Sequence, residues 1–176
     1  PAVGRSRSAL RSTISPPAIH PQPVRIGLPK EINVLEHRVG LTPASVRELN
    51  ANGHAVIVEV SAGQGIGMDD DAYRQAGATI VATAAEVFRQ ADMIVKVKEP
   101  QAIERAMLRP GQILFTYLHL APDADQAREL VSSGAVCLAY ETVTSSSGGL
   151  PLPAPMSEVA ARMAVHGRTF LVGCRH

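Results

Sequence analysis

The chain has 176 residues, enough for one domain with a buried core. Its 17 basic and 16 acidic residues give a net charge of +1, which excludes a strongly basic nucleic-acid-binding arm and a disordered acidic tail. Aromatic residues make up 3% and tryptophan is absent, so a platform for stacking nucleic-acid bases is not expected. Two cysteines are too few for a disulfide scaffold, and no apolar run reaches the length of a membrane span. This composition is typical of a soluble enzyme or binding domain.

Residues 1–24 differ in composition from the rest of the chain. They contain three arginines, four serines and five prolines, and no acidic residue. The Arg/Ser bias is compatible with an organellar targeting peptide, but the prolines would break the amphipathic helix that such a peptide needs. We therefore predict a disordered extension here, with an artefact of upstream translation and a targeting segment as the alternatives.

From Val24 onward, short apolar strands alternate with capped helices. The predicted strands are 24–28, 55–60, 79–81, 93–97, 113–118 and 136–140. The predicted helices are about 43–53, 70–76, 83–90, 102–107 and 123–132, with a last helix from Ser157 to Val165 after the loop 145–155. Helix starts are marked by Thr42-Pro43 and by a capping box at Thr83–Glu86. This alternation predicts an α/β fold, a Rossmann-like parallel sheet with helices on both faces.

A glycine motif after the second strand resembles a dinucleotide-binding loop. Residues 62–67 read AGQGIG, but Met68 stands where the third glycine of G-x-G-x-x-G belongs. Three aspartates, 69–71, then open the next helix, where they suit the helix N-terminus but would repel a pyrophosphate. We predict a turn before an acid-capped helix, and no nucleotide site in this domain.

Sites in parallel sheets form at the carboxyl ends of the strands, which directs attention to 29–38, 98–100 and 118–122. His119 follows the strand in LFTYLHLAP, where its titration range suits proton transfer near neutral pH. The alternative is a half-buried histidine at a strand end that only hydrogen-bonds to the backbone.

Cationic side chains follow two other predicted strands, 93–97 and 24–28. Lys96 and Lys98 in IVKVKEP point to the same side of their strand, and Lys98 lies nearer its end. Arg38 lies in the loop KEINVLEHRVGLTP, and its fork suits a carboxylate. Together with His119 they suggest a site for a small 2-oxo or 2-amino acid. The alternatives are a solvated loop arginine and an edge lysine that reaches solvent and pairs with Glu99.

These same segments resemble a known family. RIGLPKEINVLEHRVGLTPASVREL, GHAVIVEVSAGQGIGMDDDAY, IVKVKEPQ, GQILFTYLHLA, AYETV and LPAPMSEVAARMAV look like the amino-terminal domain of bacterial alanine dehydrogenases. The proton-translocating nicotinamide nucleotide transhydrogenases have a related domain, but FTYLHLA favours the alanine dehydrogenase branch. The likeness runs from about Arg25 to Val165.

The resemblance implies an NAD-dependent oxidoreductase that interconverts L-alanine with pyruvate and ammonia. It places the catalytic histidine on His119, the substrate-binding residues on Arg38 and Lys98, and a serine near the cofactor phosphates on Ser157. It also implies a cytoplasmic homo-oligomer with no metal, nucleic-acid or membrane partner. His119 would polarise the substrate oxygen and carry its proton, and the two cations would bind the carboxylate.

The sequence departs from the family pattern after Val165. Where the family continues into its NAD domain, residues 166–176 read HGRTFLVGCRH, and the chain contains no G-x-G-x-x-G segment. We therefore expect an extension (1–24), a substrate domain (25–165) and an aberrant or truncated tail (166–176). The chain would be a fragment, a frameshifted product or a free-standing domain, inactive without an NAD domain. A transhydrogenase domain and a non-enzymatic carboxylate-binding module are the alternative functions.

Overall fold

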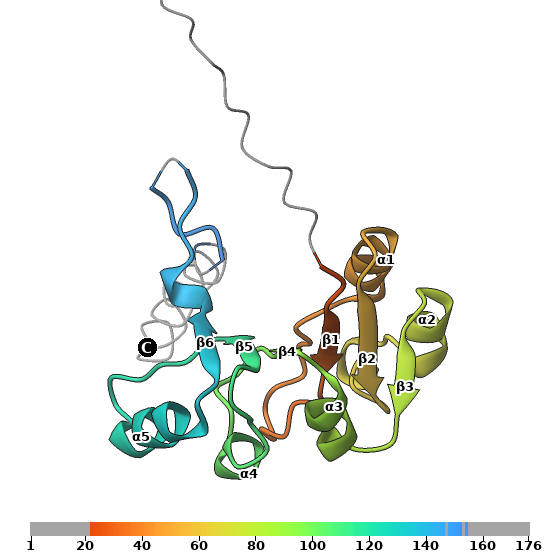
Figure 1. Cartoon of the computed structure of the whole chain (residues 1–176). Helices are drawn as coiled ribbons and strands as arrows, with labels where there is room; N and C mark the ends of the chain where they lie inside the picture. The colour runs from red at the N-terminus through yellow and green to blue at the C-terminus, as the bar shows by residue number, and fades with distance from the viewer. Residues whose placement is uncertain (1–21, 147, 153, 155–176) are drawn as a thin grey trace, which may run out of the picture.

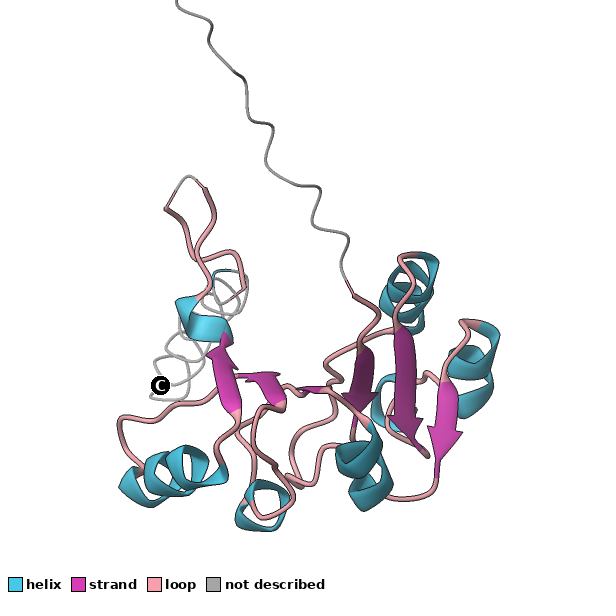
Figure 2. Cartoon of the chain, viewed as in Figure 1, coloured by secondary structure: helices cyan, strands magenta, loops and turns pink. Residues whose placement is uncertain are grey.

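The structure is a computed structural model, and it describes residues 22–146, 148–152 and 154. Six parallel strands form one sheet in the order β3-β2-β1-β4-β5-β6, with helices beside it, which confirms the predicted α/β class (Figures 1 and 2). The strands are β1 (Arg25–Leu28), β2 (Ala55–Glu59), β3 (Thr79–Val81), β4 (Met93–Val95), β5 (Ile113–Thr116) and β6 (Val136–Ala139). The α-helices are α1 (Pro43–Ala51), α2 (Asp70–Gln75), α3 (Ala84–Gln90), α4 (Ala102–Arg105) and α5 (Ala124–Ser133). Two 3-10 turns, Gln64–Ile66 and Tyr140–Thr142, were not predicted.

The helix starts predicted at Thr42-Pro43 and at Thr83 are confirmed with one change in detail, and the helix predicted from Ser157 lies outside the described residues. Pro43 opens α1 behind Thr42, whose side chain caps the helix. At α3 the Thr83 hydroxyl accepts a hydrogen bond from the Glu86 main-chain N–H at 3.3 Å. The returning carboxylate of Glu86 accepts from the main-chain N–H of Ala82 at 3.0 Å, one residue before the expected partner. The capping box is therefore displaced by one residue on that side.

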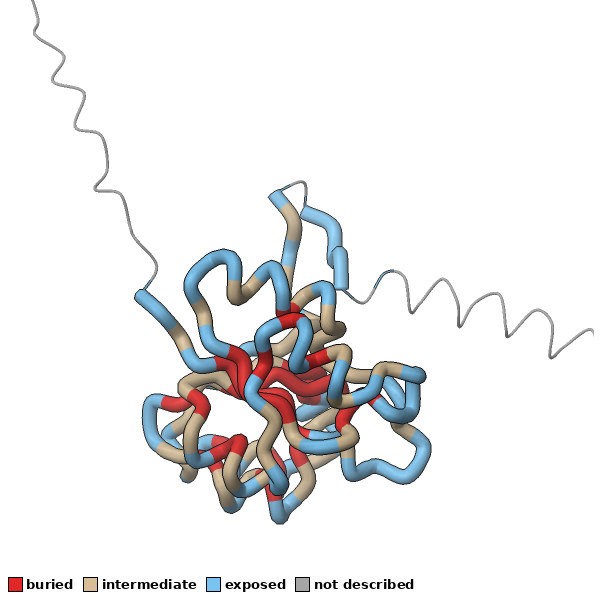
Figure 3. Tube along the Cα trace, turned by 90° about the vertical axis from the view of Figure 1, so that its right-hand side faces the viewer, coloured by how far each residue is buried: buried red, intermediate tan, exposed pale blue. Residues whose placement is uncertain are grey.

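Hydrophobic cores lie on both faces of the sheet, and Figure 3 shows the buried residues gathered toward the middle of the chain trace. Successive residues of β2 divide between them, because side chains along a strand alternate in direction. Ile57 joins the core that α3 and α5 cover, and Val56 and Val58 join the core beneath α1 and α2.

Helix cover is less complete over β6 than the expectation of a sheet covered on both faces implied. Cys137 and Ala139 pack against the core on the α5 side. Val136 and Leu138, which alternate with them, remain 50% and 45% exposed in the described part of the chain.

No helix of the described residues is both long enough and apolar enough to cross a membrane.

Gly27 allows α3 to lie close to β1. A Cβ atom at this position would come within 2.6 Å of Val87 Cγ1 and 2.7 Å of Ala91 Cβ, both on the α3 side. Such distances are far below van der Waals contact, so the core on this face depends on a residue without a side chain.

Two strands end two residues earlier than predicted, but their chains stay together beyond the strand ends. β4 was expected to reach Val97 and β5 Leu118, whereas they end at Val95 and Thr116. The main-chain N–H of Tyr117 still donates to the Val97 carbonyl at 3.3 Å. The segments that follow β4 and β5 are therefore held side by side.

Candidate functional site

The extended pairing of β4 and β5 brings two predicted site residues to the same part of the sheet edge. The Tyr117 N–H donates a hydrogen bond to the Val97 carbonyl. Lys98 is the residue after Val97, and His119 lies two residues after Tyr117. The hydroxyl of Thr116 donates to the main-chain carbonyl of Lys98 at 2.8 Å, a second contact between the two segments. The segments that carry Lys98 and His119 therefore lie side by side at this edge of the sheet.

Tyr117 is the residue that links His119 to Arg38. Its ring lies nearly parallel to the His119 imidazole, with 5.8 Å between centroids and 10° between planes. Tyr117, Val97 and Arg38 also line one cavity of about 380 Å³, together with Tyr140. Arg38 therefore lines the cavity itself, whereas Lys98 and His119 lie next to its lining, Lys98 as the residue after Val97 and His119 through its ring beside Tyr117.

Arg38 is held by a carboxylate from its own loop. Glu36 accepts hydrogen bonds from Arg38 Nε at 2.7 Å and Nη2 at 2.5 Å, and from the Arg38 main-chain N–H at 2.9 Å. The Glu36 side chain is only 5% exposed, against 45% for Arg38. The hydrogen bonds from Arg38 hold the pKa of Glu36 below its usual value against the opposing effect of burial, and Lys98 also contributes. The structure therefore keeps Glu36 ionised and fixes the guanidinium at the edge of the cavity.

Lys98 and its neighbour Glu99 do not form the ion pair that the sequence suggested as an alternative. No carboxylate of the described residues makes an ion pair with Lys98. The Lys98 residue is partly buried, and its positive charge contributes to lowering the pKa of Glu36. An ammonium group in this position can interact with an anionic ligand bound near Arg38.

His119 has an unusual backbone conformation, with φ +46°. Glu141 stabilises it, because its Oε1 accepts from the main-chain N–H of His119 at 2.9 Å and of Leu118 at 3.1 Å. Burial acts to raise the pKa of Glu141, but these and its own main-chain hydrogen bond outweigh burial and lower the pKa. The imidazole is exposed at the sheet edge, whereas its backbone is fixed by an ionised carboxylate. Glu141 was missed as a site residue, although AYETV was one of the family-like segments.

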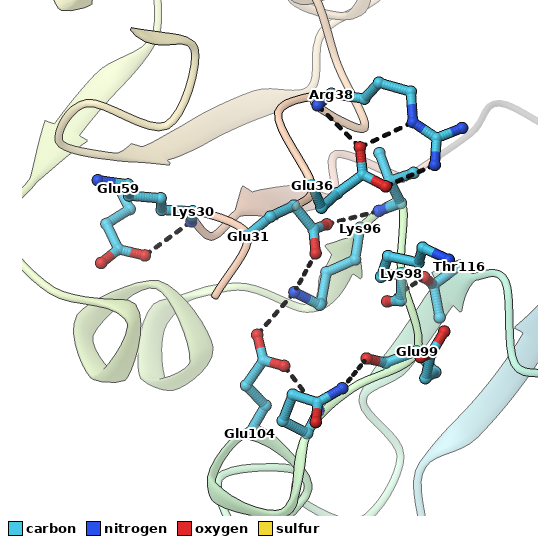
Figure 4. A network of polar contacts seen from close by, with 12 residues as sticks. Lys30, Glu31, Glu36, Arg38, Glu59, Lys96, Lys98, Glu99, Glu104 and Thr116 are labelled. Carbon is cyan, nitrogen blue, oxygen red and sulfur yellow. Dashed lines mark hydrogen bonds and ion pairs between the residues drawn. The ribbon is translucent and has the colours of Figure 1, made fainter. Parts of the chain in front are cut away.

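Lys96, the other lysine of IVKVKEP, has a different environment from Lys98. It is fully buried, and its Nζ lies 3.0 Å from Glu31 Oε2 and 2.7 Å from Glu104 Oε1 (Figure 4). Both carboxylates are also buried, at 5% and 1% exposure. The cost of burying this ammonium group is thus offset by two partners from other elements. Nothing in the local sequence distinguished Lys96 from Lys98, because the partners come from the β1–α1 loop and from α4.

The glycine turn does not fit an NAD phosphate group. At the glycine turn, a Cβ on Gly63 would lie 2.5 Å from the Met68 carbonyl oxygen, and one on Gly65 would lie 3.0 Å from His37 Cβ. These glycines thus permit close packing within the protein. Asp69 caps α2 by accepting from the Ala72 N–H at 2.8 Å, as predicted. Ser157, the predicted contact to the cofactor, lies outside the described residues.

Within the described ranges, no group of three or more His, Cys, Asp or Glu side chains is placed to hold a metal ion.

The candidate site consists of two cations, a histidine and two orienting glutamates at the carboxyl edge of a doubly wound sheet. Such a set can bind a small carboxylate and exchange a proton with it.

Comparison with known proteins identifies the family. Residues 27–160 match the model described as alanine dehydrogenase/PNT, N-terminal domain, and the chain belongs to this family. It is 54% identical over 142 residues to an alanine dehydrogenase of Halomonas elongata and 49% identical over 141 residues to one of Mycobacterium tuberculosis. Those alignments cover 81% and 80% of this chain, but 38% of each relative. The chain therefore matches little more than a third of these relatives.

Solved structures agree with this assignment. A structure of an L-alanine dehydrogenase aligns with a TM-score of 0.77 and 45% identity over 81% of this chain and 39% of the other. A transhydrogenase from Sinorhizobium meliloti aligns with a TM-score of 0.63 and 29% identity over 66% of this chain and 35% of the other. The sequence resemblance to the alanine dehydrogenase family is thus confirmed.

Proposed function

We propose that this chain is the substrate-binding part of an L-alanine dehydrogenase, the enzyme that interconverts L-alanine with pyruvate and ammonia using NAD. The observation that supports the proposal is the cavity lined by Arg38, Val97 and Tyr117, with Lys98 next to Val97 in the chain and the His119 ring beside Tyr117. The family assignment supports it, as does the higher identity to alanine dehydrogenase structures than to the transhydrogenase.

In this proposal the two cations bind the substrate carboxylate. Arg38 supplies a guanidinium whose orientation Glu36 fixes, and Lys98 supplies a second positive charge near it. A carboxylate between two such groups is fixed in orientation, which places its neighbouring carbon for reaction.

His119 would exchange a proton with the substrate's oxygen or nitrogen. Its main chain is fixed by Glu141, and its ring is supported by Tyr117, so the imidazole is oriented before a ligand arrives. No redox step is assigned to the residues of this site. We expect the chain alone to produce no NADH from L-alanine; NADH formation by purified chain would contradict this.

The binding step can be tested directly on the 176-residue chain. Pyruvate binding, followed by ligand-observed NMR, should be weakened at least tenfold by Arg38→Ala or Lys98→Ala. Arg74→Ala is the matched control, since this exposed arginine pairs with Asp71 on α2, away from the site. Equal pyruvate affinity in Arg38→Ala and Arg74→Ala would refute the proposal.

A transhydrogenase domain is a second candidate function, because the fold is shared with the Sinorhizobium meliloti protein, and a non-enzymatic carboxylate-binding module is the remaining alternative. Fusing the chain to the NAD-binding part of an alanine dehydrogenase would separate them, because only the proposed function predicts alanine-dependent NADH formation. A cytoplasmic homo-oligomer, implied by the resemblance, would be tested by localisation and by light scattering.

A further inference from the structure

Glu31 connects the loop that carries Arg38 to the chain segment that carries Lys98. Its side chain is 5% exposed and bonds to two consecutive residues after β4 (Figure 4). Oε2 lies 3.0 Å from Lys96 Nζ, and Oε1 accepts from the Val97 main-chain N–H at 2.7 Å. Lys98 is the next residue along the chain.

The segment with Lys98 is also held from elements other than this loop. Glu104 on α4 forms an ion pair with Lys96 at 2.7 Å, and Thr116 on β5 donates to the Lys98 carbonyl at 2.8 Å. Loss of Glu31 would therefore leave Lys98 attached to β5 and α4. What it would remove is the connection to the loop of residues 30–38.

That loop is exposed on much of its surface. Val34 and Leu35 at its tip are each 87% exposed, and the Glu36–Arg38 hydrogen bonds lie within the loop itself. Its start is joined to β2 by Glu59, which accepts from the Lys30 N–H at 2.7 Å. Glu31 therefore supplies a buried polar connection from this loop to the segment after β4, and Glu59 supplies a hydrogen bond from the same loop to β2.

We propose that Glu31 is a positioning residue that sets the separation between Arg38 and Lys98, so that both can bind one substrate carboxylate. This inference rests on the proposed function. Two cations share a carboxylate well only when their separation is fixed beforehand, and small displacements of a supporting group weaken such a site. A buried charged cluster is weak evidence for a stabilising role, because apolar residues of similar volume are often as good for stability. Fixing the separation between Arg38 and Lys98 is a role that the charged cluster can have in addition to any effect on stability.

The test is a double-mutant cycle on the full chain, with pyruvate as the probe and ligand-observed NMR as the assay. Glu31→Ala should weaken pyruvate binding by about tenfold, since Arg38 is no longer placed against Lys98. In the Glu31→Ala background, Arg38→Ala should then cost less than about threefold, although it costs tenfold or more alone. Glu59→Ala, which loosens the same loop from β2, should change pyruvate affinity less than threefold.

A second variant keeps the test valid if Glu31→Ala does not fold, as judged by circular dichroism. Glu31→Gln retains an acceptor for the Val97 N–H and loses the charge, so it should weaken binding two- to fivefold with the same non-additivity toward Arg38→Ala. Multiplicative effects of Glu31 and Arg38 variants, unchanged affinity in both Glu31 variants, or an equal loss in Glu59→Ala would overturn the positioning role. If the wild-type chain does not bind pyruvate, or Arg38→Ala binds it normally, the proposed function itself fails.

Discussion

The buried charges around Lys96 lead to a prediction whose size follows from the structure. Lys96→Met removes the one cation between Glu31 and Glu104, whose side chains are 5% and 1% exposed. Breaking a buried ion pair from one side leaves an uncompensated charge and costs roughly 3–5 kcal/mol. For a domain of this size each kcal/mol lowers the melting temperature by about 3 °C, so we expect a fall of roughly 10–15 °C.

The matched control removes all three charges together. The triple variant Glu31→Gln, Lys96→Met and Glu104→Gln keeps acceptors for the main-chain N–H groups of Val97 and Gln101, which the two carboxylates now bind at 2.7 and 2.8 Å. Replacing a whole buried ionic cluster by neutral groups of similar volume is often neutral or stabilising. The triple variant should therefore melt within about 5 °C of the wild type.

Thermal melts followed by circular dichroism, and urea unfolding of the same three proteins, provide the comparison. A Lys96→Met protein as stable as the wild type would refute the reasoning, since the carboxylates would then not need their cation. A triple variant as unstable as the single one would also refute it, because the loss would come from packing around the Lys96 stem.

Three further changes concern stability, and one concerns activity. Gly27→Ala should cost about 1–3 kcal/mol through its clash with Ala91, seen as a lower melting temperature than wild type; an unchanged melt would contradict this. Because Arg38 lowers the pKa of Glu36 below its ordinary 4.5, ionised Glu36 adds stability above that pH and loses it as the pH falls through the folded-state pKa. The melting-temperature difference between wild type and Glu36→Gln should thus shrink below about pH 4.5, and a constant difference would count against it. Glu141→Ala should cost about 1–3 kcal/mol and speed amide hydrogen exchange at His119 more than Glu141→Gln does. In a fusion with a relative's NAD-binding part, His119→Ala should lower kcat about 10²–10⁴-fold; near-normal turnover would leave the histidine a structural role.

Local sequence signals determined the order and the type of the elements. Thr42, Asp69 and Thr83 cap their helices through neighbours three residues away, and Gly134 ends α5 in the left-handed conformation. Such interactions involve only nearby residues, so the sequence alone can predict them. The rule that sites form at the carboxyl edge of parallel strands selects Arg38, Lys98 and His119 from the sequence alone.

The tertiary structure decided which charges are free to bind a ligand. Lys96 and Lys98 are two residues apart in the same pattern, but Lys96 is enclosed by Glu31 and Glu104 and Lys98 is not. Glu141 reaches the His119 backbone across 22 residues of chain. The partners of these groups come from distant segments that meet only when the sheet assembles, and the free energy of a buried charge depends on those partners. Composition and periodicity predict that a residue lies at a strand end, whereas its role depends on what the rest of the fold places beside it.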